Sequence, residues 1–275
     1  VANDATDNFY FRNLGNGRFE NEAVIRGLAF GEGGQGVSSM GPAVGDINRD
    51  GWLDLYIPDM GYGCLLMSQE GFFEDWTDRS RLAVICGQYA GWGGVLFDLD
   101  NDGYLDLFIA NGNVHFEYPE EDVLAINDGY GLFTDVAVHS GDYFHEKYVG
   151  RGATFGDYDN DGDLDLLVVN LNGPARLLRN DGGNRQHWLK LDVRLPNGLS
   201  TAIGARVTVT AGKLVQIHDV VPVVGYLSQA DPRCHFGLGT ATKADRVEIR
   251  WPNGQRTELK DVAADQILTV VQDAK

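Results

Sequence analysis

The sequence predicts an all-β protein in which a partial or complete β-propeller is followed by a small β-sandwich or barrel. Three observations support this fold class. An acidic nine-residue segment occurs three times, each copy runs directly into an apolar segment of strand length, and Gly-, Asp- and Asn-rich turn signals separate the segments. No segment shows the periodic apolar pattern of a substantial helix, so no helix is expected.

The acidic segments occupy residues 46–54, 98–106 and 157–165, here called loop 1, loop 2 and loop 3. All three read D-x-[DN]-x-D-G-x-L-D. Oxygen ligands at positions 1, 3, 5 and 9, with a backbone carbonyl at position 7, suit Ca²⁺, and glycine at position 6 permits the sharp turn. The sequence therefore predicts three Ca²⁺ sites, whose ligands would be Asp46, Asn48, Asp50, Trp52 and Asp54; Asp98, Asp100, Asp102, Tyr104 and Asp106; and Asp157, Asp159, Asp161, Asp163 and Asp165.

A plain Asp-Gly hairpin turn without a metal is the alternative interpretation of any single loop. Three loops in phase favour metal binding, because the five aspartates of loop 3 would repel one another strongly without a cation. EF-hands fit less well. Position 12 lacks the bidentate glutamate and is Ile57, Ile109 or Val168, and the flanking segments resemble strands.

A second motif recurs in phase with the loops. It reads N-x-G-x-G-x-F from Asn13 and from Asn127, and returns more loosely near Ser68 and Asn180. A period on the order of 50 residues with Gly and aromatic punctuation is typical of propeller blades of four short strands. In the second repeat these strands are predicted at residues 94–97, 104–110, 122–127 and 132–136.

The loops resemble those of FG-GAP/VCBS repeats, which form the calcium-binding blades of integrin-type propellers, and residues 1–13 resemble the outer part of such a blade. The last third resembles the ASPIC/UnbV domain that follows these repeats in bacterial secreted proteins and in the cartilage acidic protein family. The matching blocks are residues 187–191, 203–207, 225–229, 235–239 and 247–254. Proteins with these domains share no single activity, so the resemblance implies a fold and calcium binding only.

Two domains are expected: calcium-binding repeats over residues 1–184, with an incomplete N-terminal blade, and an ASPIC/UnbV-like β domain over 185–275. Turn signals follow Pro196 and Pro252. The strands predicted in the second domain span 188–194, 205–211, 213–221, 246–251 and 266–271.

The phase of the repeats predicts that the N-terminal blade is incomplete. Asp59, Asn111 and Asn170 each lie 13 residues after the first aspartate of their loop, shortly before the second motif. Asn3 occupies the equivalent position before the motif at Asn13, so its own loop would begin upstream of Val1. A closed propeller needs at least about four blades. We expect either further sequence or another chain to complete the sheet, through an open strand edge that pairs with a neighbouring strand.

Composition excludes several classes of partner. The formal charge is −18, with 40 acidic and 22 basic residues, which disfavours nucleic acid and anionic membranes and suits an extracellular protein. No apolar stretch is long enough for a membrane span. Cys64 and Cys86 could form a disulfide or remain buried thiols, and Cys234 is expected to be a buried apolar residue.

The function predicted is that of a secreted, calcium-stabilised module for binding, adhesion or self-assembly. Its partner would be a protein, another copy of the chain or a glycan stacked on aromatic residues such as Trp92. The alternative is an enzyme or ligand-binding subunit with its site in the propeller channel or at the domain junction, to which His145 and Glu146 could contribute. His235, in an apolar segment, is expected to be a hydrogen-bonded core residue.

Overall fold

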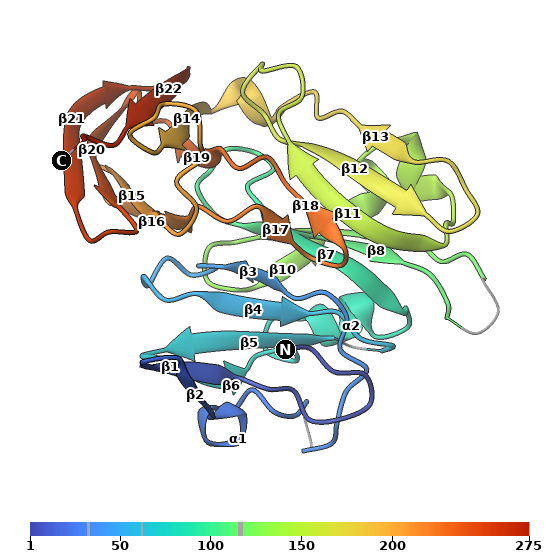
Figure 1. The fold of residues 1–275 in the computed structure, drawn as a ribbon. Coiled ribbons are helices and arrows are strands. Elements are labelled where there is room, and N and C mark those ends of the chain that lie inside the picture. The colour runs from blue at the N-terminus through green and yellow to red at the C-terminus, as the bar shows by residue number, and fades with distance from the viewer. Residues whose placement is uncertain (32–33, 62, 115–117, 275) are drawn as a thin grey trace.

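The computed structural model describes residues 1–31, 34–61, 63–114 and 118–274 (Figure 1). It is all-β with a propeller arrangement, so the predicted fold class is confirmed. Antiparallel sheets that follow one another along the chain form the blades. The first complete blade contains β3 (Ala43–Gly45), β4 (Asp54–Ile57), β5 (Cys64–Gln69) and β6 (Phe72–Asp75). The second contains β7 (Gly91–Phe97), β8 (Asp106–Asn111), β9 (Val123–Asn127) and β10 (Phe133–Asp135).

All four strands predicted for the second repeat are present, and β8 begins two residues later than expected because loop 2 extends to its first residue. The third blade has three strands, β11 (Gly150–Gly156), β12 (Asp165–Asn170) and β13 (Arg176–Leu178). Ahead of the complete blades lies a hairpin of β1 (Phe11–Gly15) and β2 (Arg18–Asn21), whose residues are all exposed.

Apolar side chains pack between neighbouring blades. One core cluster joins the first and second blades through residues such as Tyr56, Leu65 and Leu107. Another joins the second and third through Phe108 and Val168. Every residue of β8 is buried, as expected for a strand covered on both faces. β8 is therefore covered by a neighbouring blade on each face, whereas β12, which follows loop 3, keeps Leu167 and Val169 exposed on one face.

The C-terminal domain is a β-sandwich around one core cluster. One sheet has the order β19 (Cys234–Gly239), β14 (His187–Arg194) and β22 (Gln266–Val271), and the other has β16 (Leu214–Asp219), β15 (Arg206–Ala211), β20 (Lys243–Arg250) and β21 (Arg256–Ala263). The sequence prediction missed β19 and β21. The polar, mostly exposed residues of β21 carry little of the apolar alternation from which a strand is inferred.

A small hairpin of the C-terminal domain, β17 (Val223–Val224) and β18 (Ser228–Gln229), lies against the inner strands β7 and β11 (Figure 1). Glycines make this close approach possible. A Cβ atom added at Gly41 would lie 2.1 Å from the backbone nitrogen of Tyr226, and one added at Gly225 would lie 2.5 Å from the carbonyl oxygen of Gly94. The hairpin therefore docks closely because glycines on both sides of the contact carry no side chain.

Short helices correct the expectation that the chain has none. They are α1 (Ala23–Arg26), α2 (Leu82–Cys86) and the 3₁₀ turns η1 (Ala137–His139), η2 (Asp142–His145) and η3 (Gly183–Arg185). Each is only about one turn long, too short to produce a periodic apolar pattern. Among the described residues, no helix has both the length and the apolar character needed to cross a membrane.

Cys64, Cys86 and Cys234 are buried thiols and form no disulfide among the described residues. Of the two alternatives for Cys64 and Cys86, the structure therefore holds the buried thiols. Burial raises the pKa of Cys86 to about 12, so this thiol is neutral and acts as a small apolar residue.

Candidate metal centres

The three loops share one backbone conformation. Positions 4 and 6 both have positive φ, 59° and 89° at Arg49 and Gly51 in loop 1, and 61° and 88° at Asn101 and Gly103 in loop 2. Glycine adopts this left-handed region without cost and asparagine does so more readily than arginine. The glycine at position 6 thus has the role that the sequence predicted, and loop 1 carries the less suitable residue at position 4.

The aspartate at position 1 closes each turn. In loop 1 its two carboxylate oxygens accept hydrogen bonds from the backbone N–H groups of Asp50 and Gly51, both at 3.0 Å. In loop 3 the carboxylate of Asp157 accepts the equivalent bonds at 3.0 and 3.2 Å. These bonds fix the first carboxylate at the centre of the turn.

The aspartate at position 9 connects the loop to the second repeated motif. One of its carboxylate oxygens accepts from the N–H at position 2 of the loop. The other accepts from the first residue of the second motif, which is Ser68 at 2.7 Å, Asn127 at 2.9 Å and Asn180 at 2.9 Å. The two motifs recur in phase because they are hydrogen-bonded to each other.

The same asparagines join neighbouring blades. Asn127 donates through Nδ2 to the carbonyl of Ile47 in loop 1, and Asn180 donates to that of Leu99 in loop 2. Each of these loops is therefore tied to the blade that follows it. Within the described part of the chain, this bond between blades is absent at Ser68, which lacks the amide.

Carboxylates converge in loops 2 and 3 as predicted for a metal site. Oxygens of Asp98, Asp100 and Asp106 lie within 4.8 Å of one another. The same holds for positions 1, 3 and 9 of loop 3, which are Asp157, Asp159 and Asp165. At position 5, one oxygen of Asp50, Asp102 or Asp161 accepts from the N–H at position 7. The position-7 carbonyls of Trp52, Tyr104 and Asp163 stay predicted ligands.

Burial makes these carboxylates costly to ionise in the absence of a cation. Desolvation, reinforced by neighbouring aspartates, raises the pKa of Asp46 to about 6 and those of Asp54 and Asp102 to about 7. In loop 2 it raises the pKa values of Asp98 and Asp106 well above the usual range. Oδ1 of Asp98 is also buried with no hydrogen-bond partner in the described structure. A divalent cation would supply both the missing partner and the opposite charge, so the residues present fit Ca²⁺.

Comparison with known proteins adds to this geometry. The FG-GAP-like repeat family matches residues 1–57 and 98–168, and the ASPIC and UnbV family matches residues 196–275. The chain therefore contains FG-GAP-like repeats and an ASPIC and UnbV domain. It is 28% identical over 297 residues to cartilage acidic protein 1 of mouse and of human. The alignment covers 98% of this chain but 42% of the mouse protein and 40% of the human one. The chain thus spans about two-fifths of the length of these relatives. The solved structure of the V. cholerae biofilm matrix protein Bap1 aligns with a TM-score of 0.25 at 11% identity, over 95% of this chain and 59% of that one.

The ASPIC and UnbV domain packs directly on loop 2. Asn101 donates to the carbonyls of Gly162 and Gly183 at 2.9 and 3.0 Å, and its Oδ1 accepts from Nε2 of His235 at 2.6 Å. A Cβ atom added at Gly237 would lie 2.1 Å from Oδ2 of Asp98. Loop 2 is thus enclosed between the FG-GAP-like blades and β19.

The prediction that His235 is a hydrogen-bonded core residue holds for one of its two ring nitrogens. His235 bonds Asn101 as a hydrogen-bonded residue should, but its Nδ1 is buried without a partner in the described structure. Burial lowers its pKa well below the usual range, so the ring is neutral.

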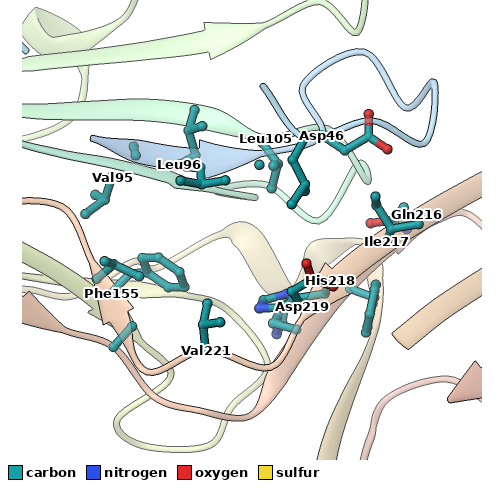
Figure 2. Close-up of a pocket in the computed structure, with 18 of the residues that line it drawn as sticks. Asp46, Val95, Leu96, Leu105, Phe155, Gln216, Ile217, His218, Asp219 and Val221 are labelled. Carbon is teal, nitrogen blue, oxygen red and sulfur yellow. The ribbon is translucent and has the colours of Figure 1, made fainter. Parts of the chain in front are cut away.

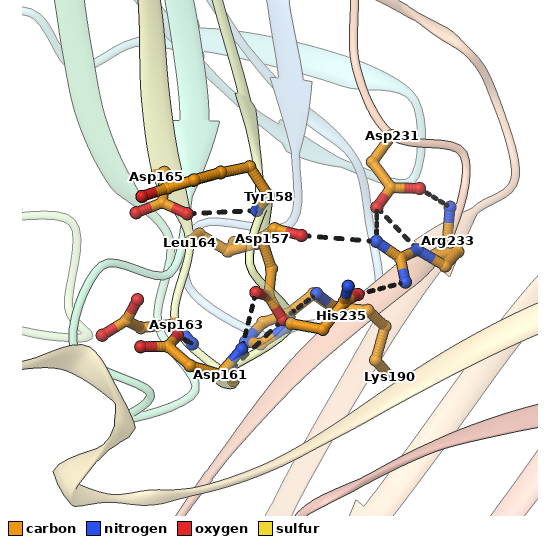
Figure 3. Close-up of polar contacts among 12 residues, drawn as sticks. Asp157, Tyr158, Asp161, Asp163, Leu164, Asp165, Lys190, Asp231, Arg233 and His235 are labelled. Atoms are coloured by element: carbon orange, nitrogen blue, oxygen red, sulfur yellow. Dashed lines mark hydrogen bonds and ion pairs between the residues drawn. The ribbon is translucent and has the colours of Figure 1, made fainter. Parts of the chain in front are cut away.

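Loop 3 meets the ASPIC and UnbV domain through two cations that the sequence analysis missed (Figure 3). Nζ of Lys190 lies 2.5 Å from Oδ2 of Asp157, and neither side chain is more than 1% exposed. Arg233 donates to Oδ1 of Asn160 at 2.8 Å and to Oδ2 of Asp231 at 2.5 Å. In β14 the alternate residues Leu189, Leu191 and Val193 face the domain core, so Lys190 lies on the other face of the strand. This alternation could have indicated from the sequence that Lys190 contacts a group outside that core.

The other candidate residues lie elsewhere. His145 and Glu146 are exposed at the end of η2. Trp92, considered for stacking on a sugar, contacts the ring of Tyr226 edge-on at 5.2 Å and the guanidinium of Arg151 at 4.1 Å. The ASPIC and UnbV hairpin therefore occupies part of its surroundings.

Proposed function

We propose that this chain is a secreted, calcium-stabilised FG-GAP-like repeat protein that serves as a binding or assembly module. The observation that carries the proposal is the buried carboxylate cluster of loop 2, with its unpartnered oxygen on Asp98. Such a cluster is unfavourable when empty and becomes favourable around a hard cation.

Calcium would act by stabilising the folded blades. A ligand that binds only the folded state adds about 2.7 kcal/mol at a hundredfold excess over its Kd. Extracellular calcium modules work with Kd values around 10⁻⁴ to 10⁻³ M, so millimolar calcium would occupy such loops substantially.

Thermal unfolding in millimolar Ca²⁺ and in a chelator tests the proposal. We expect the midpoint to rise with Ca²⁺, and to rise less with equal Mg²⁺, which demands stricter octahedral geometry. Calorimetric titration would count the sites, for which three are expected. Identical melting curves with and without calcium would refute the stabilising role.

For the partner, we propose contact through the exposed β1–β2 hairpin. Phe11 and Phe19 are 51% and 60% exposed there. Within the described residues β1 pairs only with β2, so its other edge can accept a strand from another chain, including a second copy. Sedimentation of the Phe11→Lys variant should show weaker association than the wild type. A matched variant on α2, Val84→Lys, should associate normally, since Val84 is also exposed but lies outside this edge.

An enzymatic role is not what we propose. His145 and Glu146 lie exposed rather than in an enclosed site. The name of the matched relatives, cartilage acidic protein 1, denotes no catalytic activity.

A further inference from the structure

A cavity of about 370 Å³ lies at the junction between the blades and the ASPIC and UnbV domain (Figure 2). Strands β3 and β7 form one wall with residues such as Val44 and Leu96. The opposite wall comes from β16, β17 and the segment between them, with Ile217 and Val221. Its volume falls in the range of roughly 300–1,000 Å³ that is usual for small-molecule sites.

The lining is largely apolar and still accessible. Val44, Val221 and Val223 are 54%, 46% and 70% exposed although they surround a single hollow. Clustered apolar side chains that remain accessible mark binding sites more often than single ones do. Beside the cavity the two domains are in close contact, since neither Gly41 nor Gly225 has room for a Cβ atom. The hollow is therefore confined to one part of the domain junction.

Two imidazoles that line the cavity have a nitrogen without a hydrogen-bond partner in the described structure, but Nδ1 of His235 is fully buried, so His218 is the one that can reach a ligand. The ring of His218 points into the hollow (Figure 2), and its nitrogens make no hydrogen bond to any described residue. Neighbouring polar groups are already engaged. Asp219 forms a two-point ion pair with Arg206 at 2.6 and 2.8 Å, and Gln216 donates to the carbonyl of Gly237 at 2.7 Å. The imidazole is the group left to meet a ligand.

The charges around the cavity limit the ligand. Asp46 of loop 1, Asp219, Asp231 and the cation Arg49 lie along its lining. Asp219 and Asp231 are paired with Arg206 and Arg233, and Arg49 stacks on Tyr104, so these charges are already engaged. The apolar walls also oppose any ion that must lose its water. An uncharged molecule meets no such obstacle.

We propose that this cavity binds an uncharged, mainly apolar small molecule that forms one hydrogen bond with His218. The inference rests on the hollow and its apolar lining and requires no bound cation, although Asp46 of loop 1 is part of that lining. It assigns to the junction a role that the repeats alone do not provide.

The test uses the whole chain in millimolar Ca²⁺ and the neutral fluorescent probe N-phenyl-1-naphthylamine, whose N–H can donate to the imidazole. Val44→Phe should fill the hollow from β3 and abolish the saturable fluorescence increase. Val84→Phe is the matched control, since this exposed residue of α2 lies outside the cavity. It should bind the probe like the wild type.

His218→Phe separates the hydrogen bond from the shape, because the new ring can keep the contact that His218 makes with Phe236 at 6.0 Å. We expect affinity to fall about 3- to 10-fold, the usual worth of one neutral hydrogen bond. Val223→Phe fills the hollow from the opposite wall, and near-ultraviolet circular dichroism verifies that each variant is folded. Wild-type affinity in folded Val44→Phe or Val223→Phe would overturn the proposal, as would a wild-type protein that does not bind the probe saturably.

Discussion

Loop 1 and loop 2 have the same nine-residue pattern but very different surroundings. In loop 2 no residue is exposed, whereas residues 50–52 of loop 1 face solvent. Burial raises the pKa values of Asp98 and Asp106 well above their usual range, while those of Asp46 and Asp54 rise to about 6 and 7. The motif determines the geometry of the turn, and the neighbouring domain determines how strongly burial disfavours the ionised carboxylates, and so how much we expect a bound cation to contribute. Loop 3 differs from both: residues 158–161 face solvent, and Lys190 already places one positive charge beside Asp157.

The largest effect is expected for Lys190→Met. Removing one partner of a buried ion pair leaves Asp157 uncompensated and should lower the free energy of unfolding by about 3–5 kcal/mol in a chelator. Calcium should recover part of this loss, since a cation in loop 3 again faces Asp157. Denaturant unfolding measures both effects. The surface variant Lys213→Met serves as control, and equal losses in the two variants would show that the ion pair is unimportant.

The next effect distinguishes loop 2 from loop 1. Asp98→Asn should remove most of the calcium-dependent stabilisation of one site, about 2.7 kcal/mol at a hundredfold excess over Kd. Asp46→Asn should remove less, because solvent screens the exposed loop. Melting curves with and without calcium compare the two variants. Equal losses would mean that enclosure by the ASPIC and UnbV domain adds nothing to the site.

A smaller effect concerns pH in the metal-free protein. Asp54 has a pKa of about 7 in the fold against an ordinary value of 3.8, so the folded state binds its proton more tightly than the unfolded state. The stability that this provides is complete below about pH 4 and is lost as the pH rises through 7. In a chelator, the unfolding midpoint should therefore fall between pH 5 and 8, and Asp54→Asn should reduce that slope. With saturating calcium the direction reverses, because protons compete with the metal. An unchanged slope in the variant would contradict the assignment.

The smallest effect is expected for Arg49→Ala. The guanidinium of Arg49 lies 3.4 Å from the centre of the Tyr104 ring and joins loop 1 to loop 2. Losing this contact should lower the unfolding free energy by about 0.5–1 kcal/mol. Arg79→Ala removes a similar stacking on Trp76, at 3.8 Å, outside the metal loops. If the first contact couples the loops, only Arg49→Ala should also change calcium affinity.

Local features of this fold could be predicted from the sequence. The glycine at position 6, the apolar strand after each loop and the second motif lie within short segments, and each has a direct physical cause in the structure. Contacts between distant segments could not be predicted. Lys190 meets Asp157 across 33 residues, and His235 meets Asn101 across 134. Neither partner carries a local pattern that identifies the other. The one-turn helices and the polar strand β21 were missed because they leave no periodic signal.

The glycines beneath the β17–β18 hairpin have a consequence for the whole molecule. Gly41, just before β3, and Gly152 on β11 belong to different blades, and a Cβ atom added at either would meet the hairpin, at the backbone of Tyr226 or at Oγ of Ser228. One methyl group at Gly41 would overlap the backbone of Tyr226 and displace the hairpin. Because β19 of the same domain covers loop 2, we expect the displacement to weaken that cover, although the added atom touches none of the loop's aspartates.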